Sequence, residues 1–277
     1  MHIIPDPKLH GLHGYREVVE TVASGLTQLG HQVTSAINQF DPAATNILFG
    51  AHMLPLERVN ELPANSISYN LEQVRDLDVA HFSPAQRACL ERFEIWEYCP
   101  ANLPTWQGLR NRRIKLVPIG YAPVLSRIPR AGVQDIDVLI YGMSGPKRLG
   151  AFHRLSLAGV TVVFVSGVYG EARDQLISRA KLVLNVNIHD RSRIFEIVRV
   201  SYLFANRKAV VAIMDPQTFV EEDIASGVKF TTLEQLVADC QPILENDHMR
   251  IEMENKGFDV IARRDIRTIL SQALAAS

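Results

Sequence analysis

The sequence has few cysteines, no excess of charge of either sign and no long apolar run. Its three cysteines, Cys89, Cys99 and Cys240, are too scattered for a zinc site or a disulfide framework. The net charge of −1, from 29 basic and 30 acidic residues, does not favour nucleic acid or an anionic membrane as a partner. Any anion-binding site is therefore a local feature of the surface.

Signals for export, membrane insertion and metal binding are also missing. The first residues lack the basic flank and apolar core of a signal peptide, and no segment reaches the roughly 18 apolar residues of a transmembrane helix. No two histidines have the helical spacing of a zinc site, and no serine lies in a GxSxG pattern. We therefore expect a cytoplasmic protein with no transmembrane segment, no metal and no cofactor.

Strand and helix signals alternate along the first part of the chain. An apolar run at 1–4 is followed by a helical pattern over 15–29 that ends at Gly30, and then by a strand pattern over 31–35. Further strands and helices follow as far as residue 122, a rhythm typical of a parallel sheet covered by helices. With 277 residues, of which 47% are hydrophobic, the chain is long enough for two such domains.

A second series of the same kind follows a proline-containing stretch without periodicity, which we interpret as a linker. This stretch separates a first Rossmann-like domain, residues 1–122, from a second one over 133–250. The remaining residues, 251–277, are predicted to be helical and to pack back on the first domain. The predicted fold class is therefore α/β, with two Rossmann-like domains that face a cleft at the carboxyl ends of their sheets.

The loop after the first strand of the second domain carries residues that suit an anion. It reads GMSGPKR and contains Gly142, Ser144 and Gly145 together with the cations Lys147 and Arg148. Backbone N–H groups at a helix start and two cations can bind the oxygens of a diphosphate. The alternative is a solvated turn with two surface cations.

A later helix is apolar nearly all round but carries charged residues near its start. If Ser192 caps this helix, Glu196 lies near its first turn, with Arg193 and Arg199 three residues on either side. One interpretation is a local ion pair at the helix start. The other is a ligand site, in which the Glu196 carboxylate accepts hydrogen bonds from a ribose and the arginines contact a phosphate.

Two loops of the first domain carry candidate catalytic bases for an acceptor hydroxyl. The loop HGLHG places His10 and His13 after the first strand, and a neutral imidazole there can accept a proton. The stretch YNLEQ places Glu72 after a later strand. The alternatives are a histidine that is simply a polar loop residue, and a turn that Asn70 and Gln73 cap.

The run over 181–213 resembles the corresponding part of bacterial group 1 glycosyltransferases of the GT-B fold. In both, a strand with an asparagine, here Asn187, precedes a loop, a glutamate-bearing helix, a turn and a short apolar strand. The resemblance implies that Glu196 contacts the ribose of a nucleotide sugar. It also implies that Lys147 and Arg148, or their loop, contact the diphosphate.

Two positions depart from that family pattern. Ile188 stands where the family has its first glutamate, and the turn after the helix falls at Asn206 rather than at a glycine closer to Glu196. If the alignment is displaced, Ser201 takes the place of the glutamate and Arg199 becomes the ligand contact.

The resemblance implies a metal-independent glycosyltransferase of bacterial polysaccharide biosynthesis. Such an enzyme moves a sugar from a nucleotide-diphosphate sugar to an acceptor hydroxyl on a glycan, a lipid-linked molecule or another alcohol. In this scheme His13 or Glu72 takes the acceptor proton. The alternatives are a nucleotide-sugar epimerase of the same fold and a non-catalytic nucleotide-binding protein.

Overall fold

The computed structural model describes residues 2–3, 10–37, 39–75, 77, 82–106, 113–188 and 193–275. The contacts within the chain divide it into two compact units. Residues 1–122 and 265–277 form the first unit, and residues 123–264 form the second. The chain therefore enters the second unit at Pro123 and returns to the first at Asp265.

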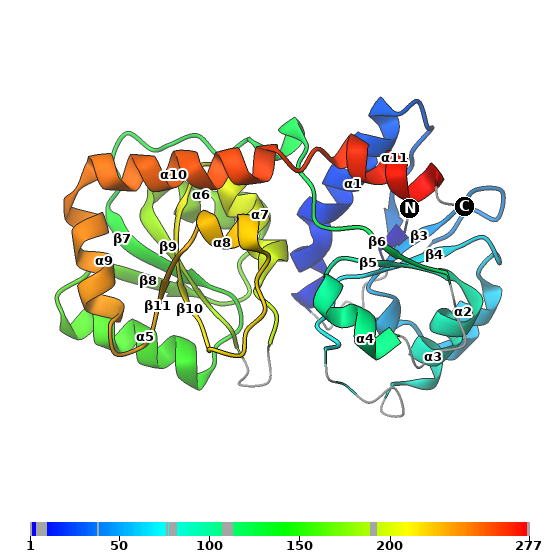
Figure 1. The fold of residues 1–277 in the computed structure, drawn as a ribbon, viewed down its shortest axis with the longest axis horizontal. Helices are drawn as coiled ribbons and strands as arrows, with labels where there is room; N and C mark the ends of the chain where they lie inside the picture. The colour runs from blue at the N-terminus through cyan, green and yellow to red at the C-terminus, as the bar shows by residue number, and fades with distance from the viewer. Residues whose placement is uncertain are drawn as a thin grey trace. The chain divides into compact units, whose positions relative to one another are not determined.

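The first unit is a parallel sheet with helices on both faces (Figure 1). Its strand order is β2-β1-β3-β4-β5-β6. The strands are β1 (His2–Ile3), β2 (Ala36–Ile37), β3 (Ile47–Phe49), β4 (Ile67–Asn70), β5 (Glu94–Glu97) and β6 (Ile114–Leu116). The helices are η1 (His10–Tyr15), α1 (Arg16–Gln28), η2 (Ala51–Met53), α2 (Leu56–Glu61), α3 (Pro84–Arg92), η4 (Pro100–Asn102), α4 (Leu103–Trp106) and α11 (Ile266–Ala275).

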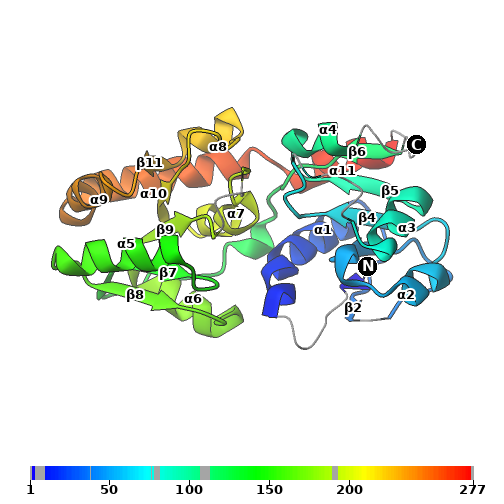
Figure 2. The same cartoon turned by 90° about the horizontal axis from the view of Figure 1, so that it is seen from below.

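Helix α11 belongs to the first unit although it lies at the end of the chain. It packs on α1, and Lys115 of β6 donates a hydrogen bond from Nζ to the carbonyl oxygen of Ala273 at 2.8 Å. Figure 2 shows β6 and α11 side by side. The helical segment expected over 251–277 is thus divided between the end of α10 (Asp247–Ala262), in the second unit, and α11, in the first.

The second unit is also a parallel sheet, with the strand order β11-β10-β9-β7-β8. Helices α5 and α9 pack on one face of it, and Figure 1 shows α10 on the opposite face. The strands are β7 (Ile136–Tyr141), β8 (Val162–Val165), β9 (Ala180–Val186), β10 (Ala209–Ile213) and β11 (Lys229–Thr231). The other helices are η5 (Pro123–Leu125), α5 (Pro146–Leu157), α6 (Gly170–Arg179), α7 (Ile197–Ala205), α8 (Glu222–Ser226) and α9 (Leu236–Glu245).

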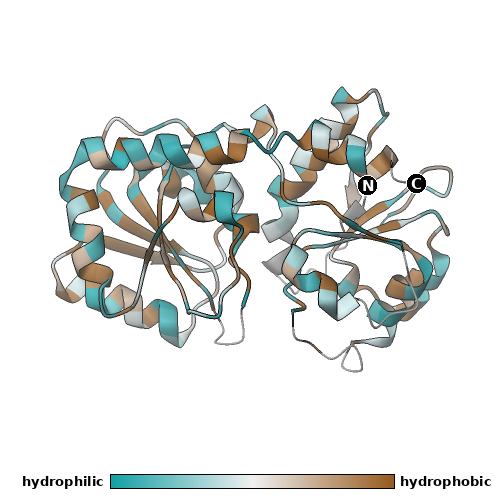
Figure 3. Ribbon diagram, in the orientation of Figure 1, coloured by the Kyte–Doolittle hydropathy of each residue, from teal (hydrophilic) through white to brown (hydrophobic). Residues whose placement is uncertain are grey.

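The strands of the second unit are nearly continuous apolar runs because helices cover both faces of their sheet. Along β7, the residues Ile136, Val138, Leu139 and Ile140 are all buried. Figure 3 shows these strands in brown, whereas the covering helices also carry hydrophilic residues, drawn in teal. Among the described residues, no helix is both long enough and apolar enough to cross a membrane.

Two boundaries expected from the sequence are wrong. The strand expected over 31–35 is instead the two-residue β2. The helix that carries Glu196 does not begin after Ser192, because α7 begins at Ile197. The preceding backbone pairs elsewhere: Phe195 donates its N–H to the carbonyl oxygen of Phe219 at 2.9 Å, which keeps this segment extended. Ser192 itself lies outside the described residues.

The stretch expected to be a linker is hydrogen-bonded to the end of α7. Ser126 Oγ donates to the carbonyl oxygen of Ala205 at 2.8 Å. The backbone N–H groups of Arg127 and Ile128 both donate to Asn206 Oδ1, each at 2.8 Å. These contacts make the stretch part of the second unit.

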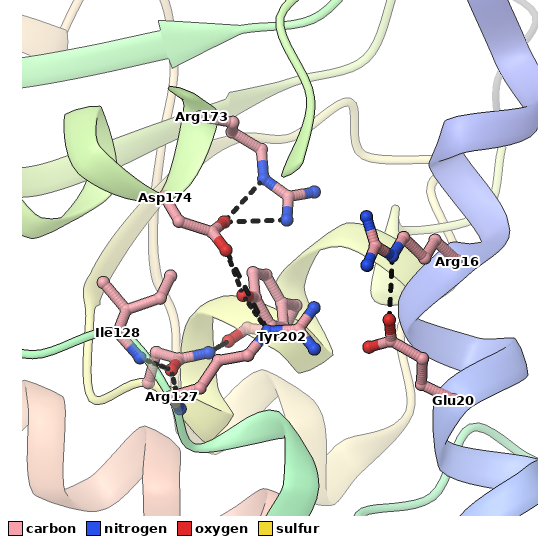
Figure 4. A network of polar contacts seen from close by, with 8 residues as sticks. Arg16, Glu20, Arg127, Ile128, Arg173, Asp174 and Tyr202 are labelled. Carbon is pink, nitrogen blue, oxygen red and sulfur yellow. Dashed lines mark hydrogen bonds and ion pairs between the residues drawn. The ribbon is translucent and has the colours of Figure 1, made fainter. Parts of the chain in front are cut away.

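Figure 4 shows Tyr202 of α7 at the centre of a polar network that holds this stretch. The Tyr202 hydroxyl donates to Asp174 Oδ2 at 2.8 Å and accepts a hydrogen bond from Arg127 Nε at 3.0 Å. The guanidinium of Arg173 lies 4.6 Å from the ring centroid of Tyr202 and donates to Asp174 at 2.8 Å. The network ties α6, α7 and the stretch after η5 together.

The packing of α7 against α10 gives a prediction about stability. At Gly257 of α10, an added Cβ would lie 2.7 Å from Phe204 Cδ1, which is closer than a Cβ normally approaches another atom. We predict that Gly257→Ala lowers the free energy of unfolding by about 1–3 kcal/mol, because the ring of Phe204 must move in a packed core. Urea unfolding followed by circular dichroism measures this difference.

Gly150→Ala, in α5, is the matched control for Gly257→Ala. The nearest side-chain atom to its added Cβ is Leu233 Cδ2, at 3.8 Å, so no displacement is needed. Alanine is a better helix former than glycine by roughly 1 kcal/mol, and we expect this variant to be at least as stable as the wild type. A similar loss of stability in both variants would contradict the packing argument.

Candidate functional site

In both sheets the strand order reverses beside the first strand of the unit. Strand β1 lies between β2 and β3, and β7 lies between β8 and β9. At such a reversal the two neighbouring connections leave on opposite sides of the sheet, and ligands of open α/β sheets bind at the carboxyl ends of these strands. A ligand site is therefore expected in the loops after β7 and β9, and in those after β1 and β3.

The loop after β7 turns at Gly142 and is held by Arg148. Gly142 has a φ angle of +121°, and an added Cβ would lie 2.7 Å from Arg148 Nη1, so the turn requires glycine. Arg148 is only 2% exposed, and its guanidinium donates to the carbonyl oxygens of Met143 and Val186, both at 2.8 Å. Arg148 thereby joins the loop after β7 to the end of β9.

The carboxylate of Glu196 lies between two arginines. Its Oε1 is 3.3 Å from Arg148 Nη2, and its Oε2 is 2.7 Å from Arg199 Nη1. The Arg199 guanidinium also lies over the ring of Tyr141, 5.1 Å from its centroid, and its Nη1 is 3.4 Å from Asn185 Oδ1. The ion pair considered for the helix start is present, and Arg148 is a second partner of the same carboxylate.

Arg148, Glu196 and Arg199, hereafter the arginine cluster, carry two positive charges and one negative charge. Burial and the neighbouring Arg199 lower the pKa of Arg148 to about 10, which still leaves it protonated at neutral pH. The side chain of Arg199 is 21% exposed and is the arginine of the cluster that a ligand can reach. A net positive charge beside the glycine turn and the start of α5 favours an anion.

The other residues predicted for this site lie in the segments around the arginine cluster. Ser144 and Arg193 are exposed, Lys147 is half-buried in the first turn of α5, Asn187 is buried directly after β9, and Gly145 is the extended residue before α5. Of these residues, Glu196 is in direct contact with both Arg148 and Arg199. Gly142 lies against the guanidiniums of the same two arginines. Because Arg148 is enclosed by protein groups, we assign to it the role of holding the loop after β7 in position.

In the first unit, three polar side chains meet at the reversal of strand order. Tyr15 ends η1, His52 follows β3 and Gly50, whose φ angle is +76°, and Glu72 follows β4. The Tyr15 hydroxyl donates to Glu72 Oε1, and His52 Nε2 is 3.9 Å from the same oxygen. Tyr15 and His52 line a hollow that is partly open to solvent and whose other walls include Phe82 and Trp106.

A buried carboxylate fixes the loop that carries Glu72. Glu97 is 0% exposed and accepts four hydrogen bonds, from Asn70 Nδ2 at 2.8 Å, Asn102 Nδ2 at 2.9 Å, Trp106 Nε1 at 2.6 Å and a backbone N–H at 2.9 Å. The same two asparagines donate to the carbonyl oxygen of Glu72, at 3.0 and 2.9 Å. Asn70 Oδ1 also accepts the Glu72 N–H at 3.2 Å, so Asn70 caps this turn, as the alternative interpretation of YNLEQ predicts for Asn70.

The sequence alone did not point to Tyr15, His52 or Glu97. His13, which the sequence did suggest, is exposed in η1. A signal existed for His52, because it closely follows an apolar strand and a glycine, and for Glu97, because it is an acidic residue beside Trp96 in a buried strand. Within the described part of the chain, no group of three or more His, Cys, Asp and Glu side chains could hold a metal ion.

Sequence comparison gives one distant relative. No family model matches the chain. An uncharacterised protein of Acanthamoeba polyphaga mimivirus is 22% identical over 214 residues, which cover 75% of this chain and 68% of the viral protein. This level of identity gives no information on activity.

Solved structures share the fold over nearly the whole chain. HepE of Anabaena, crystallised with UDP and glucose, is 12% identical with a TM-score of 0.61, over 99% of this chain and 98% of HepE. WaaG, a glycosyltransferase involved in lipopolysaccharide biosynthesis, is 12% identical with a TM-score of 0.61, over 100% and 99% of the two chains. Sucrose-phosphate synthase from Thermosynechococcus elongatus is 12% identical with a TM-score of 0.59, over 100% and 99%.

These likenesses establish the fold of this chain. The predicted α/β class, with two Rossmann-like domains of the GT-B type, is confirmed. The fold alone does not set the reaction, because function depends on the groups of the site.

The Glu97 network gives a prediction about pH. None of the four donors to Glu97 is charged, and burial raises the pKa of Glu97 from 4.5 to about 7. The folded protein therefore holds this proton more tightly than the unfolded chain, so the stabilising contribution is complete below pH 4.5 and is lost as the pH rises through 7. We predict that the stability of the wild type relative to Glu97→Gln falls by roughly 3 kcal/mol between pH 4.5 and 7.

Urea unfolding of both proteins across this pH range measures the difference. Glu91→Gln, which changes an exposed acid of α3, is the control for the loss of a carboxylate from this unit. A difference between Glu97→Gln and the wild type that stays constant with pH would show that Glu97 does not titrate in this range.

Proposed function

We propose that this protein is a glycosyltransferase that moves a sugar from a nucleotide-diphosphate donor to an acceptor hydroxyl. The observation that carries the proposal is the arginine cluster, with its net positive charge, at the strand-order reversal of the second unit. The match in fold to glycosyltransferases over nearly the full chain supports it. The UDP in the HepE structure supports a nucleotide as part of the donor.

In this proposal the donor diphosphate binds beside the loop 142–145. Backbone N–H groups at the start of α5 and the charge of Lys147 bind its oxygens, and Arg199 adds a second charge. Arg148 holds the loop in place through its bonds to Met143 and Val186. These groups stabilise the negative charge that develops on the leaving diphosphate, a role that we assign to the protein rather than to a metal ion.

Glu196 has a defined task in this scheme. Its carboxylate lies in the cluster next to the bound nucleotide and accepts hydrogen bonds from the ribose, while Asn187 and Arg193 border the same loops. The ion pairs with Arg148 and Arg199 keep this carboxylate in place before the donor arrives. Three points are predictions from the sequence alone. They are a role in bacterial polysaccharide synthesis, a cytoplasmic location, and the kind of molecule that bears the acceptor hydroxyl.

A non-catalytic nucleotide-binding protein is the second candidate. It is favoured by Ile188, because the resemblance to group 1 glycosyltransferases places a glutamate at this position. Both candidates predict nucleotide binding, and they differ in whether a nucleotide sugar is consumed.

Nucleotide binding tests the proposed donor site. We predict that UDP, GDP or ADP binds the wild type in isothermal titration calorimetry, and that Lys147→Gln weakens the binding roughly 10- to 100-fold, since a hydrogen bond to a charged group contributes about 1.5–3 kcal/mol. Lys256→Gln, which changes an exposed lysine of α10, should bind as the wild type does. Failure of all three nucleotides to bind, or equal binding by Lys147→Gln, would contradict the proposed site.

Product analysis separates the two candidates. Formation of free nucleoside diphosphate together with a glycosylated acceptor from the matching nucleotide sugar supports glycosyl transfer. Nucleotide binding without any turnover, in the presence of glycerol and glucose as acceptors, supports the non-catalytic protein.

A further inference from the structure

The guanidinium of Arg199 lies among side chains from three elements of the second unit. Its Nη1 is 2.7 Å from Glu196 Oε2 and donates a long hydrogen bond of 3.4 Å to Asn185 Oδ1. Its central carbon lies 5.1 Å from the ring centroid of Tyr141, which is within the range of a cation–π contact. Tyr141 ends β7, Asn185 lies near the end of β9, and Glu196 directly precedes α7.

The pairing of β7 with β9 explains why two of these side chains meet. The register pairs Leu139 with Val183, and continuing it by two residues places Tyr141 beside Asn185 on the same face of the sheet. Both are buried, since Tyr141 is 7% exposed and Asn185 is 1% exposed. The two side chains are therefore rigid neighbours of the more exposed Arg199.

The backbone of the loop after β7 lies against the same guanidinium. A Cβ added at Gly142 would lie 2.9 Å from Arg199 Nη2, so the absence of a side chain at Gly142 leaves room for Arg199. The positive charge of Arg199 is thereby held beside the loop 142–145, where the donor diphosphate is proposed to bind.

Asn185 is an unusual residue for its position. Its neighbours in β9, Leu184 and Val186, are apolar and equally buried. Among the described residues, Arg199 is the hydrogen-bond partner of the Asn185 side chain. A buried amide in an apolar strand costs stability unless it is hydrogen-bonded, and residues that lower stability are typical of functional sites.

Arg199 also requires groups that favour its position. It is close enough to Arg148 for its charge to lower the pKa of Arg148, and like charges repel one another. The one carboxylate of the arginine cluster, Glu196, is shared between both arginines. Tyr141 and Asn185 supply attraction to Arg199 without adding a charge.

We infer that Tyr141 and Asn185 are positioning residues, which hold the Arg199 guanidinium in the orientation that contacts the donor diphosphate. This inference rests on the proposed function. The ring face of Tyr141 attracts the cation, and Asn185 Oδ1 accepts one N–H of Nη1. The N–H groups of Nη2 and Nε are then left for phosphate oxygens, and neither positioning residue touches the donor.

The first test is calorimetric titration with UDP, or with GDP or ADP if that is the nucleotide that binds. We expect Tyr141→Leu to weaken binding roughly 3- to 30-fold, and Tyr141→Phe, which keeps the ring, to bind within about twofold of the wild type. Phe164→Leu, which changes a half-buried aromatic residue of β8, is the control and should bind as the wild type does.

A double-mutant cycle distinguishes positioning from a general effect on the fold. Arg199→Met should weaken nucleotide binding by itself. In the Arg199→Met protein, Tyr141→Leu should cause no further loss, because the ring then has no guanidinium to hold. If Tyr141→Leu weakens binding by the same factor with and without Arg199, the ring does not act through Arg199 and the inference is overturned.

Asn185→Leu gives a second measurement, which also decides the matter if Tyr141→Leu does not fold. The change keeps the branched shape and removes the amide. A positioning role predicts that nucleotide binding weakens at least about threefold while stability in urea is equal to or greater than that of the wild type. Loss of affinity together with stability, or binding as in the wild type, would overturn the role of Asn185.

The outcomes separate this inference from the proposed function. A wild type that binds no nucleotide would contradict the proposed function and this inference with it. Weaker binding by Arg199→Met, with binding as in the wild type by Tyr141→Leu and Asn185→Leu, would overturn the inference and leave the donor site intact.

Discussion

The reversal of strand order beside β1 and β7 is the constraint on which both candidate sites depend. It brings loops from neighbouring strands together at the carboxyl ends of each sheet. Each unit then fixes its loops with a buried ionisable side chain. In the second unit Arg148 connects the loop after β7 to the end of β9, and in the first unit Glu97 connects the loop after β4 to η4 and α4.

The two buried side chains have different partners. Arg148 has a carboxylate partner, but it shares Glu196 with Arg199, so the group retains a net positive charge. Glu97 has no charged partner and relies on four neutral hydrogen-bond donors. Burying a charge is costly unless it is paired and hydrogen-bonded, and incomplete compensation is expected where an approaching ligand supplies the missing charge. On this account the net positive charge of the arginine cluster binds an anionic donor, and Glu97 holds the loop after β4 in place.

The sequence predicted the elements better than it predicted their contacts. Apolar runs and turn residues located most strands and helices, because a strand covered on both faces must be apolar along its length. The predicted start of α7 was wrong. The segment before α7 stays extended because Phe195 pairs with Phe219, which lies farther along the chain. The pair of Glu196 with Arg199 was visible as an i,i+3 spacing, whereas Arg148 lies 48 residues away and joins them only through the fold. His52 follows no spacing rule, because its neighbour Glu72 comes from another loop. Glu97 bonds to Asn70, 27 residues earlier in the chain, as well as to residues that closely follow it, and no regular spacing announces this set.

A crystal structure of the protein grown with UDP tests the central claim most directly. The account predicts that the diphosphate lies beside the loop 142–145, with Lys147 and Arg199 in contact with its oxygens and Glu196 at the ribose. UDP bound elsewhere on the chain would contradict the assignment of the donor site to the arginine cluster. A crystal without UDP, from a solution in which calorimetry also detects no binding, would contradict nucleotide recognition itself.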